Sequence, residues 1–228
     1  MLTPEHRDIA GQAAGLRRMR STKPVKVITV TGGKGGVGKT NISANLAIAM
    51  SMLGRRVMLL DADLGLANID VLLGLQPSHS LADVVSGSRR LEEVIVTGPA
   101  GIRVIPGASG LSDMANLTPA QHAGIIHAFS ELTEDLDALI VDTAAGLSEG
   151  VLRFCEAGNE VLVVVCDEPT SITDAYALIK ILSTERGVSR FRIITNMTHQ
   201  GGDGRHLFEK LLRVTERFLQ VTLDHAGS

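Results

Sequence analysis

Ten residues near the start of the chain, GGKGGVGKTN at positions 32–41, carry the residue types that bind phosphate. They fit the phosphate-loop pattern, with Gly33, Gly38, Lys39 and Thr40 at the required offsets. The glycines let backbone N–H groups converge on phosphate oxygens without Cβ clashes, and a following helix adds partial positive charge at its N-terminus. Lys39 is expected to neutralise the β and γ phosphates, and Thr40 to offer its hydroxyl to Mg²⁺.

The segments around this loop supply the setting that the motif requires. An apolar run at 25–30 predicts a strand before the loop, and apolar residues at helical spacing predict a helix after it. The competing interpretation is a glycine-rich turn that binds no ligand. The strand–loop–helix setting favours a nucleotide site with contacts from Gly33, Lys34, Gly35, Gly36, Val37, Gly38, Lys39, Thr40 and Asn41.

Acidic residues follow two other strand-like runs. Asp61 and Asp63 stand two residues apart, so their side chains point the same way if the strand continues. Asp142 ends the run 139–142 and precedes small residues. Beside a nucleotide, these carboxylates would hold Mg²⁺-bound waters and position the attacking water. Otherwise they are a solvated acidic turn and an ordinary strand end.

Near-continuous apolar runs alternate with amphipathic patterns along the chain. Strands are expected near 25–31, 57–61, 94–97, 103–106, 139–142, 161–166 and 192–196, and helices near 40–53, 81–86, 119–132, 149–156, 172–184 and 205–220. This order predicts an α/β fold of the phosphate-loop NTPase type, a mostly parallel twisted sheet with helices on both faces. Ligands of such sheets lie at the carboxyl ends of the strands, where each acidic motif falls.

The composition limits the class of protein. Of the 228 residues, 44% are hydrophobic but only 3% are aromatic, so Val, Ile, Leu and Ala must build the core. A net charge of −3 argues against strong DNA binding. Two cysteines make no disulfide framework, and no apolar run is long enough to span a membrane, so a cytoplasmic protein is expected. The seven histidines do not stand at metal-ligand spacing.

Residues 1–24 differ from the domain expected at 25–228. They carry five basic and two acidic residues, and Ile9, Ala13 and Leu16 recur at helical spacing. One interpretation is a disordered basic tail. The other is an arm with a short helix that becomes ordered on a partner.

Together these motifs resemble the ParA/MinD family of deviant phosphate-loop ATPases. The second loop lysine, Lys34, carries the resemblance, together with the stretch from Asp61 to Asp63 and the sequence DTAAG at 142–146. Within the family, DADLGLANIDVLLG at 61–74, QHAG at 121–124 and CDEPTSITDAYA at 166–177 are similar to the FlhG/FleN flagellar-number regulators. The resemblance covers about residues 25–225.

The resemblance implies that Lys34 acts on a second subunit. It would reach across an ATP-bound homodimer to the partner's phosphates, while Lys39 and Thr40 serve phosphate and Mg²⁺ within one subunit. Such a lysine acts like an arginine finger, because it adds charge at the phosphates only when two subunits meet. ATP would then favour the homodimer, and hydrolysis to ADP and phosphate would release it.

The resemblance also assigns the remaining site residues. Asp63 would place the hydrolytic water with Asp61 beside it, and both Asp61 and Asp142 would serve the metal. Asn196, at the end of a strand, would contact adenine. Relatives often follow this asparagine with arginine, whereas this chain has Met197.

The implied activity is a slow, Mg²⁺-dependent ATP switch that controls flagellar number or placement. The implied partners are a flagellar master transcription activator of the FleQ type, the FlhF GTPase and flagellar C-ring components. Gln12, Leu16 and Arg17 match an element with which some relatives stimulate FlhF, although Gly11 replaces its aspartate, a helix-capping residue.

Relatives continue beyond this point with an amphipathic helix that targets the membrane. Attachment to the inner membrane or to the flagellated pole is therefore expected only through that segment, beyond Ser228. Two other functions compete with the flagellar switch. One is a module that binds partner proteins, in which the nucleotide only adjusts the shape of the module and little hydrolysis occurs. The other is a positioning or DNA-segregation ATPase.

Overall fold

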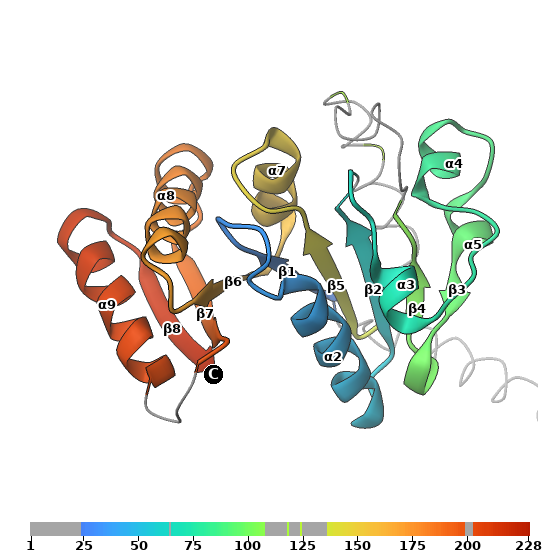
Figure 1. The fold of residues 1–228 in the computed structure, drawn as a ribbon. Helices are drawn as coiled ribbons and strands as arrows, with labels where there is room; N and C mark the ends of the chain where they lie inside the picture. Colours follow the sequence, from blue (N-terminus) through green and yellow to red (C-terminus); the bar gives the residue numbers. More distant parts are fainter. Residues whose placement is uncertain (1–23, 64, 108–117, 119–123, 125–135, 199–202) are drawn as a thin grey trace, which may run out of the picture.

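The computed structural model describes residues 24–63, 65–107, 118, 124, 136–198 and 203–228 (Figure 1). Its strands form one eight-stranded sheet in the order β3-β4-β2-β5-β1-β6-β7-β8. All neighbouring pairs are parallel except β3 and β4. The strands are β1 (Lys26–Thr31), β2 (Val57–Ala62), β3 (Val96–Thr97), β4 (Arg103–Ile105), β5 (Ala138–Thr143), β6 (Glu160–Cys166), β7 (Arg190–Asn196) and β8 (Thr222–Gly227).

Helices pack on both faces of this sheet, as the apolar runs predicted. The longer ones are α2 (Lys39–Met52), α7 (Glu149–Ala157), α8 (Pro169–Arg186) and α9 (Asp203–Phe218). Short ones are α3 (Ile69–Leu73), α4 (Leu81–Val85), α5 (Leu91–Val94) and the 3₁₀ turn η1 (Pro99–Gly101). In Figure 1, α2 lies against the central strands, and α8 and α9 accompany the β6–β8 end of the sheet.

Consecutive residues of the central strands enter different hydrophobic clusters. On β5, Ile140 packs in the cluster that includes α2, whereas Leu139 and Val141 pack in a cluster with residues of α4 and α5. Odd and even positions of β6 separate in the same way, and its other face packs on α7, α8 and α9. This alternation confirms a mostly parallel sheet that is covered on both faces.

The structure corrects several expected boundaries. Val94, expected to begin a strand, ends the helix α5, and the five-residue helix α3 was not predicted. β8 was also not predicted, because only Leu223 of this edge strand is buried and its apolar signal is weak. The helix expected at 119–132 and the arm with Gln12, Leu16 and Arg17 lie outside the described residues.

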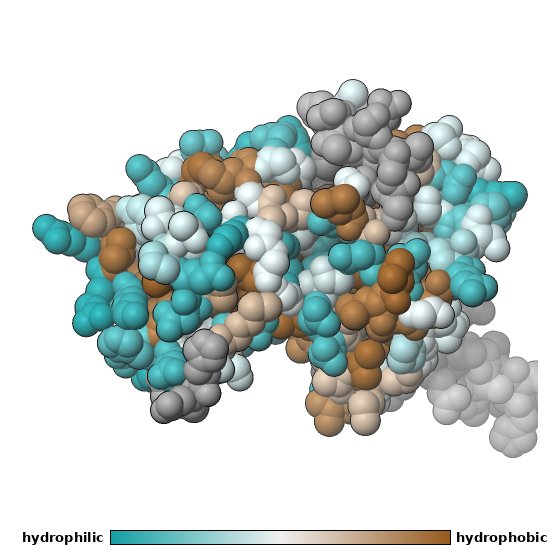
Figure 2. Space-filling view, viewed as in Figure 1, coloured by the Kyte–Doolittle hydropathy of each residue, from teal (hydrophilic) through white to brown (hydrophobic). Residues whose placement is uncertain are grey.

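Exposed apolar side chains lie on α3 and the segment before it, and at the far end of α2. Leu66, Val71 and Leu72 lie on that segment and on α3, and Met52 and Leu53 end the adjacent α2. Figure 2 shows hydrophobic residues on this part of the surface, in the same view as Figure 1. We call these five residues the α2–α3 patch. In the described part of the chain, no helix is both long and apolar enough to cross a membrane.

Replacing Ile140 with alanine should destabilise the domain by about 2–5 kcal/mol, because the side chain is fully buried in the central strand and truncation leaves a cavity. Urea unfolding of the nucleotide-free protein measures this loss. The matched control is Val71→Ala, at a side chain that is 77% exposed, which should change the unfolding free energy by less than about 0.5 kcal/mol. Equal effects of the two changes would contradict this packing.

Candidate nucleotide-binding site

The strand register brings the phosphate loop and two acidic residues to one edge of the sheet. Asp142 on β5 pairs with Val30 of β1 on one side and with Asp61 of β2 on the other. The loop that follows β1 leads directly into α2 at Lys39. A cavity of about 520 Å³ opens at this edge. Its lining includes residues that the sequence predicted, namely Gly35, Gly36, Gly38, Lys39, Thr40, Asn41 and Asp63.

The loop needs glycine at its tight positions. Gly36 and Gly38 adopt left-handed backbone conformations with φ of 79° and 91°, which side chains with a Cβ rarely adopt. A Cβ on Gly38 would also collide with Nδ2 of Asn196, and one on Gly33 would collide with the backbone of Asp174 in α8. Gly33 therefore lets the loop pack on α8. A Cβ on Gly36 would meet no atom, so the space above that glycine is open to a ligand.

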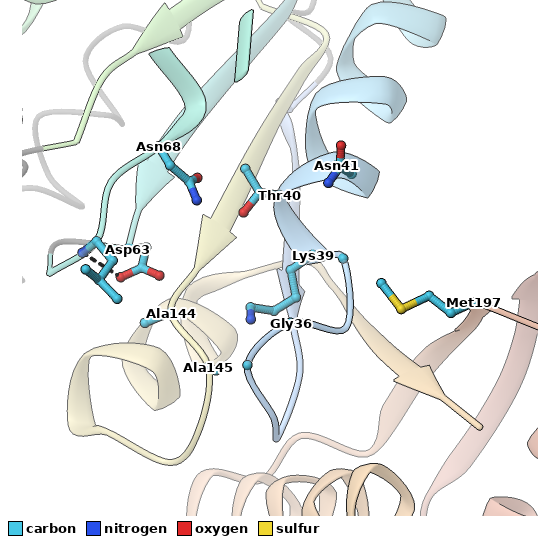
Figure 3. A pocket seen from close by; sticks show the side chains of 12 residues that line it. Gly36, Lys39, Thr40, Asn41, Asp63, Asn68, Ala144, Ala145 and Met197 are labelled. Atoms are coloured by element: carbon cyan, nitrogen blue, oxygen red, sulfur yellow. Dashed lines mark hydrogen bonds between the residues drawn. The ribbon is translucent and has the colours of Figure 1, made fainter. Parts of the chain in front are cut away.

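Lys39 supplies the positive charge of the cavity. Only 8% of the residue is exposed, and burial lowers the pKa of its ammonium group, while Asp142 and then Asp63 oppose that shift. The side chain extends along the loop toward the cavity (Figure 3). An ammonium group that has lost much of its water needs an anionic partner, and a phosphate oxygen in the cavity would provide one.

Asp142 has the environment of an incomplete cation site. Its Oδ1 accepts a hydrogen bond of 2.9 Å from the Ser43 hydroxyl, whereas its buried Oδ2 has no hydrogen-bond partner. Burial raises the pKa of this carboxyl to about 6, although hydrogen bonds from Thr40 and Ser43 work against the shift. A desolvated carboxylate beside a threonine hydroxyl is a hard oxygen donor set, so these residues fit Mg²⁺ held together with phosphate and water.

The buried carboxylate of Asp61 accepts hydrogen bonds from backbone N–H groups. It is fully buried, and its Oδ2 accepts hydrogen bonds from the backbone N–H groups of Asn68 (3.0 Å) and Ile69 (3.1 Å). Its Oδ1 accepts a third from the backbone N–H of Asp63 (3.1 Å). Burial raises the pKa of Asp61 to about 7, against the effect of these backbone donors. Asp61 was expected beside the metal, and the structure places it as an anchor of the segment that carries Asp63.

Asp63 lines the cavity itself, on the side opposite Met197 (Figure 3). Its Oδ1 accepts a hydrogen bond of 3.2 Å from the backbone N–H of Leu66. The sequence did not predict four neighbours in the lining, Leu66, Asn68, Ala144 and Ala145. The last two belong to the DTAAG sequence, whose small residues let the chain pass close to the loop.

Lys34 points away from the cavity of its own subunit. Its ammonium group contacts the carboxylate of Glu168 and the hydroxyl of Thr170 (3.2 Å) at the start of α8. The hydrogen bond to Glu168 raises the pKa of Lys34. The lining of the cavity, in the part of the chain that the structure describes, does not include Lys34. The two loop lysines are therefore placed differently, Lys39 inward and Lys34 outward.

Asn196 contacts the phosphate loop from the end of another strand. It ends β7, and its Nδ2 donates a hydrogen bond of 2.9 Å to the backbone carbonyl of Val37. The adjacent Met197 lines the cavity. The sequence placed Asn196 at the adenine, and the structure brings it to the rim of the loop with its amide nitrogen already used.

Comparisons with known proteins identify the family of the chain. A family model described as an AAA domain matches residues 25–190. The antiactivator FleN of Pseudomonas aeruginosa is 59% identical over 212 residues, which are 93% of this chain and 76% of that protein. The chain belongs to the FlhG/FleN group of ParA/MinD ATPases. This membership confirms the resemblance drawn from the loop and the acidic motifs, whereas the roles of single residues stay predictions.

Two further comparisons place the FlhG/FleN chain among its relatives. The flagellum site-determining protein YlxH of Helicobacter pylori is 37% identical over 204 residues, 89% of this chain and 69% of that protein. The solved structure of MinD complexed with Mg-ADP from Pyrococcus horikoshii OT3 has a TM-score of 0.65 at 27% identity, over 74% of this chain and 70% of that one. A relative with this fold thus binds the nucleotide and metal that the cavity fits.

The buried carboxylates predict how stability depends on pH. Asp61 has a pKa of about 7 in the folded protein against an ordinary value of 3.8, so between these values the folded state holds a proton that the unfolded state has released. The stability of the nucleotide-free protein should therefore fall as pH rises through this range, by on the order of 1 kcal/mol for each step of one in pH.

Asp61→Asn should make that fall shallower, because the amide cannot ionise and only Asp142, whose pKa burial raises to about 6, still contributes to it. Urea unfolding at a series of pH values from 5 to 8 tests this, with Asp167→Asn, at an exposed carboxylate outside the cavity, as the control. A stability that rises with pH in the wild type, or a fall of the same size in Asp61→Asn, would contradict the burial of this carboxyl.

Proposed function

We propose that this chain is a Mg²⁺-dependent ATPase that dimerises when ATP is bound and thereby regulates flagellar number or placement. The observation that carries the proposal is the convergence of Lys39, Thr40 and Asp63 on one cavity beside the phosphate loop, with the buried carboxylate of Asp142 close enough to act on the Lys39 ammonium group. Membership of the FlhG/FleN group of ATPases supports ATP as the nucleotide, and the flagellum is supported as the setting because one relative is named a flagellum site-determining protein and another an antiactivator.

Each group in the cavity has one task in hydrolysis. The loop N–H groups and Lys39 would bind the β and γ phosphates. Thr40 and Asp142 would hold the Mg²⁺ that accompanies the nucleotide. When bound, Mg²⁺ neutralises charge on the phosphates. Asp63 orients the attacking water, and Asp61 acts as a positioning residue because it fixes the backbone of the Asp63 segment.

The proposed dimer uses Lys34, the outward lysine. In one copy its charge is met by Glu168, a single carboxylate at the molecular surface. A triphosphate on a second copy carries more negative charge, so it would compete with Glu168 for Lys34. Leu66 of the α2–α3 patch lines the cavity and would lose contact with water in the same association, which adds a hydrophobic contribution.

The proposed switch would act on other proteins of the flagellar system. The ATP-bound dimer would act on a transcription activator of the FleQ type, and on C-ring components during basal-body assembly. The basic arm, through Gln12, Leu16 and Arg17, would act on the FlhF GTPase. Location in the cytoplasm, with transient membrane association, fits these partners.

Two variants separate dimerisation from hydrolysis. Lys34→Ala should fail to dimerise with ATP and should lose phosphate release by on the order of 10³-fold, as for a missing arginine finger. Asp63→Ala should still dimerise but release no phosphate, because only the water-positioning group is lost. Light scattering with Mg-ATP and a phosphate-release assay measure the two properties.

The control for the lysine is Lys180→Ala, at an exposed lysine on α8, which should behave as the wild type in both assays. A Lys34→Ala protein that dimerises and hydrolyses normally would contradict the trans lysine. Normal hydrolysis by the Asp63→Ala protein would contradict the role of Asp63 in orienting the attacking water.

Glu168→Gln should lower the ATP concentration needed for half-maximal dimerisation, because the amide holds Lys34 more weakly than the carboxylate does. A titration of light scattering against ATP measures this, and Glu185→Gln, at an exposed carboxylate near the C-terminal end of α8, is the control. An unchanged or higher requirement for ATP would contradict competition between Glu168 and the phosphates.

A further inference from the structure

Ser43 is a fully buried polar residue of α2 to which neither the motifs nor the cavity lining assigns a role. It stands three residues after Thr40, so the two side chains lie on the same side of the helix. Both donate hydrogen bonds to the carboxyl group of Asp142. The described lining of the cavity includes Thr40 but not Ser43. Ser43 therefore acts on a bound ligand only through another residue.

The Ser43 hydroxyl lies within hydrogen-bond distance of two acceptors. Its Oγ is 2.9 Å from Oδ1 of Asp142 and 3.0 Å from the backbone carbonyl oxygen of Lys39. A hydroxyl has one proton to donate, so it serves one of these acceptors at a time. The Lys39 carbonyl opens α2, where helical geometry provides it with a backbone N–H partner. An ionised carboxylate is the stronger acceptor, so the hydroxyl proton belongs to Asp142 whenever that carboxyl carries charge.

This contact makes the two oxygens of Asp142 different. Oδ1 is held by the Ser43 hydroxyl, whereas Oδ2 is buried without a hydrogen-bond partner. The bond joins β5 to α2 across 99 positions of the chain, so it ties the carboxyl group to the helix that begins at the phosphate loop. A buried acceptor without a donor is unfavourable, and a cation beside Oδ2 would remove that penalty.

We propose that Ser43 is a positioning residue for the metal: its hydroxyl holds Oδ1 of Asp142 and so leaves Oδ2 as the oxygen available to Mg²⁺ and its waters. This proposal rests on the nucleotide site proposed above. Partners that hydrogen-bond a metal-binding carboxylate fix its orientation and strengthen metal binding without touching the metal. Ser43 contributes nothing to the phosphate loop itself, so its effect on a nucleotide should depend on Mg²⁺.

Calorimetry of ADP binding over a series of Mg²⁺ concentrations, and in EDTA, tests this role. ADP is the probe because it occupies the site without being hydrolysed. Ser43→Ala should raise the Mg²⁺ concentration that gives half of the Mg²⁺-dependent gain in ADP affinity. The expected increase is roughly tenfold to a hundredfold, the loss typical when the hydrogen-bond partner of a metal ligand is removed. ADP affinity in EDTA should equal that of the wild type, because the phosphate loop is unchanged.

Two further variants separate the hydrogen bond from packing. Ser43→Cys nearly preserves the side-chain volume but donates weakly, so it should raise the Mg²⁺ requirement in the same direction as alanine does. Thr215→Val is the control, because it removes another fully buried hydroxyl of a helix. That hydroxyl donates to the backbone carbonyl of Leu211 in α9 (2.8 Å), outside the described cavity lining. The control should leave the Mg²⁺ requirement unchanged.

The outcomes distinguish this role from the nucleotide site on which it rests. An unchanged Mg²⁺ requirement in both Ser43 variants would overturn the proposal. A loss of ADP affinity that is equal with Mg²⁺ and in EDTA would also overturn it, because that loss would come from packing alone. If the wild type itself bound ADP equally well with Mg²⁺ and in EDTA, the metal site proposed above would be wrong, and the role of Ser43 with it.

Discussion

The pairing of β5 between β1 and β2 is the constraint on which the rest of the site depends. It sets Asp142 directly beside Asp61 on one side and beside the last residues before the phosphate loop on the other. Two buried carboxyl groups in this arrangement repel each other when both are ionised, and burial raises both pKa values. A cation close to the buried Oδ2 of Asp142, which has no hydrogen-bond partner, would relieve that repulsion, so the electrostatics of this edge of the sheet favour Mg²⁺ with a nucleotide.

The same edge is connected to two parts of the surface. Asp61 holds the segment with Asp63 through backbone hydrogen bonds, and that segment continues into α3 and the α2–α3 patch. On the other side, Gly33 packs on α8 while Lys34 contacts Glu168 at the start of that helix. A change of ligand at the loop can therefore reach either surface within a few residues. This proximity suits a switch whose output is association with another protein.

Local sequence was sufficient for the parts of the site that lie on continuous motifs. The loop was predicted to contact nucleotide and Asp63 to place the hydrolytic water, because residue type, spacing and strand position coincide there, and the structure brings Asp63 to one cavity with the loop residues Gly35, Gly36, Gly38, Lys39, Thr40 and Asn41. The sheet was predicted because its central strands are buried on both faces and read as apolar runs. The edge strand β8 was missed for the opposite reason, since one side of it is open to water.

Other features depend on contacts between distant segments. The Asn196 bond to Val37 joins residues 159 positions apart, and no local pattern contains it. The left-handed backbone of Met197 and the salt bridge between Lys34 and Glu168 are likewise set by tertiary packing. Asp61 was predicted at the metal because it shares its motif with Asp63, whereas its burial under that segment only becomes visible once the chain is folded.

The central claim is that each copy lends Lys34 to the phosphates of the other. The most direct measurement mixes two variants that are inactive for different reasons, Lys34→Ala and Asp63→Ala, and follows phosphate release with Mg-ATP. In a mixed dimer, the Lys34→Ala copy keeps its own Asp63 and receives Lys34 from its partner, so one site is complete. The account predicts a rate well above the sum of the two separate proteins. A rate equal to that sum, while light scattering shows that mixed dimers form, would mean that Lys34 does not act across the interface.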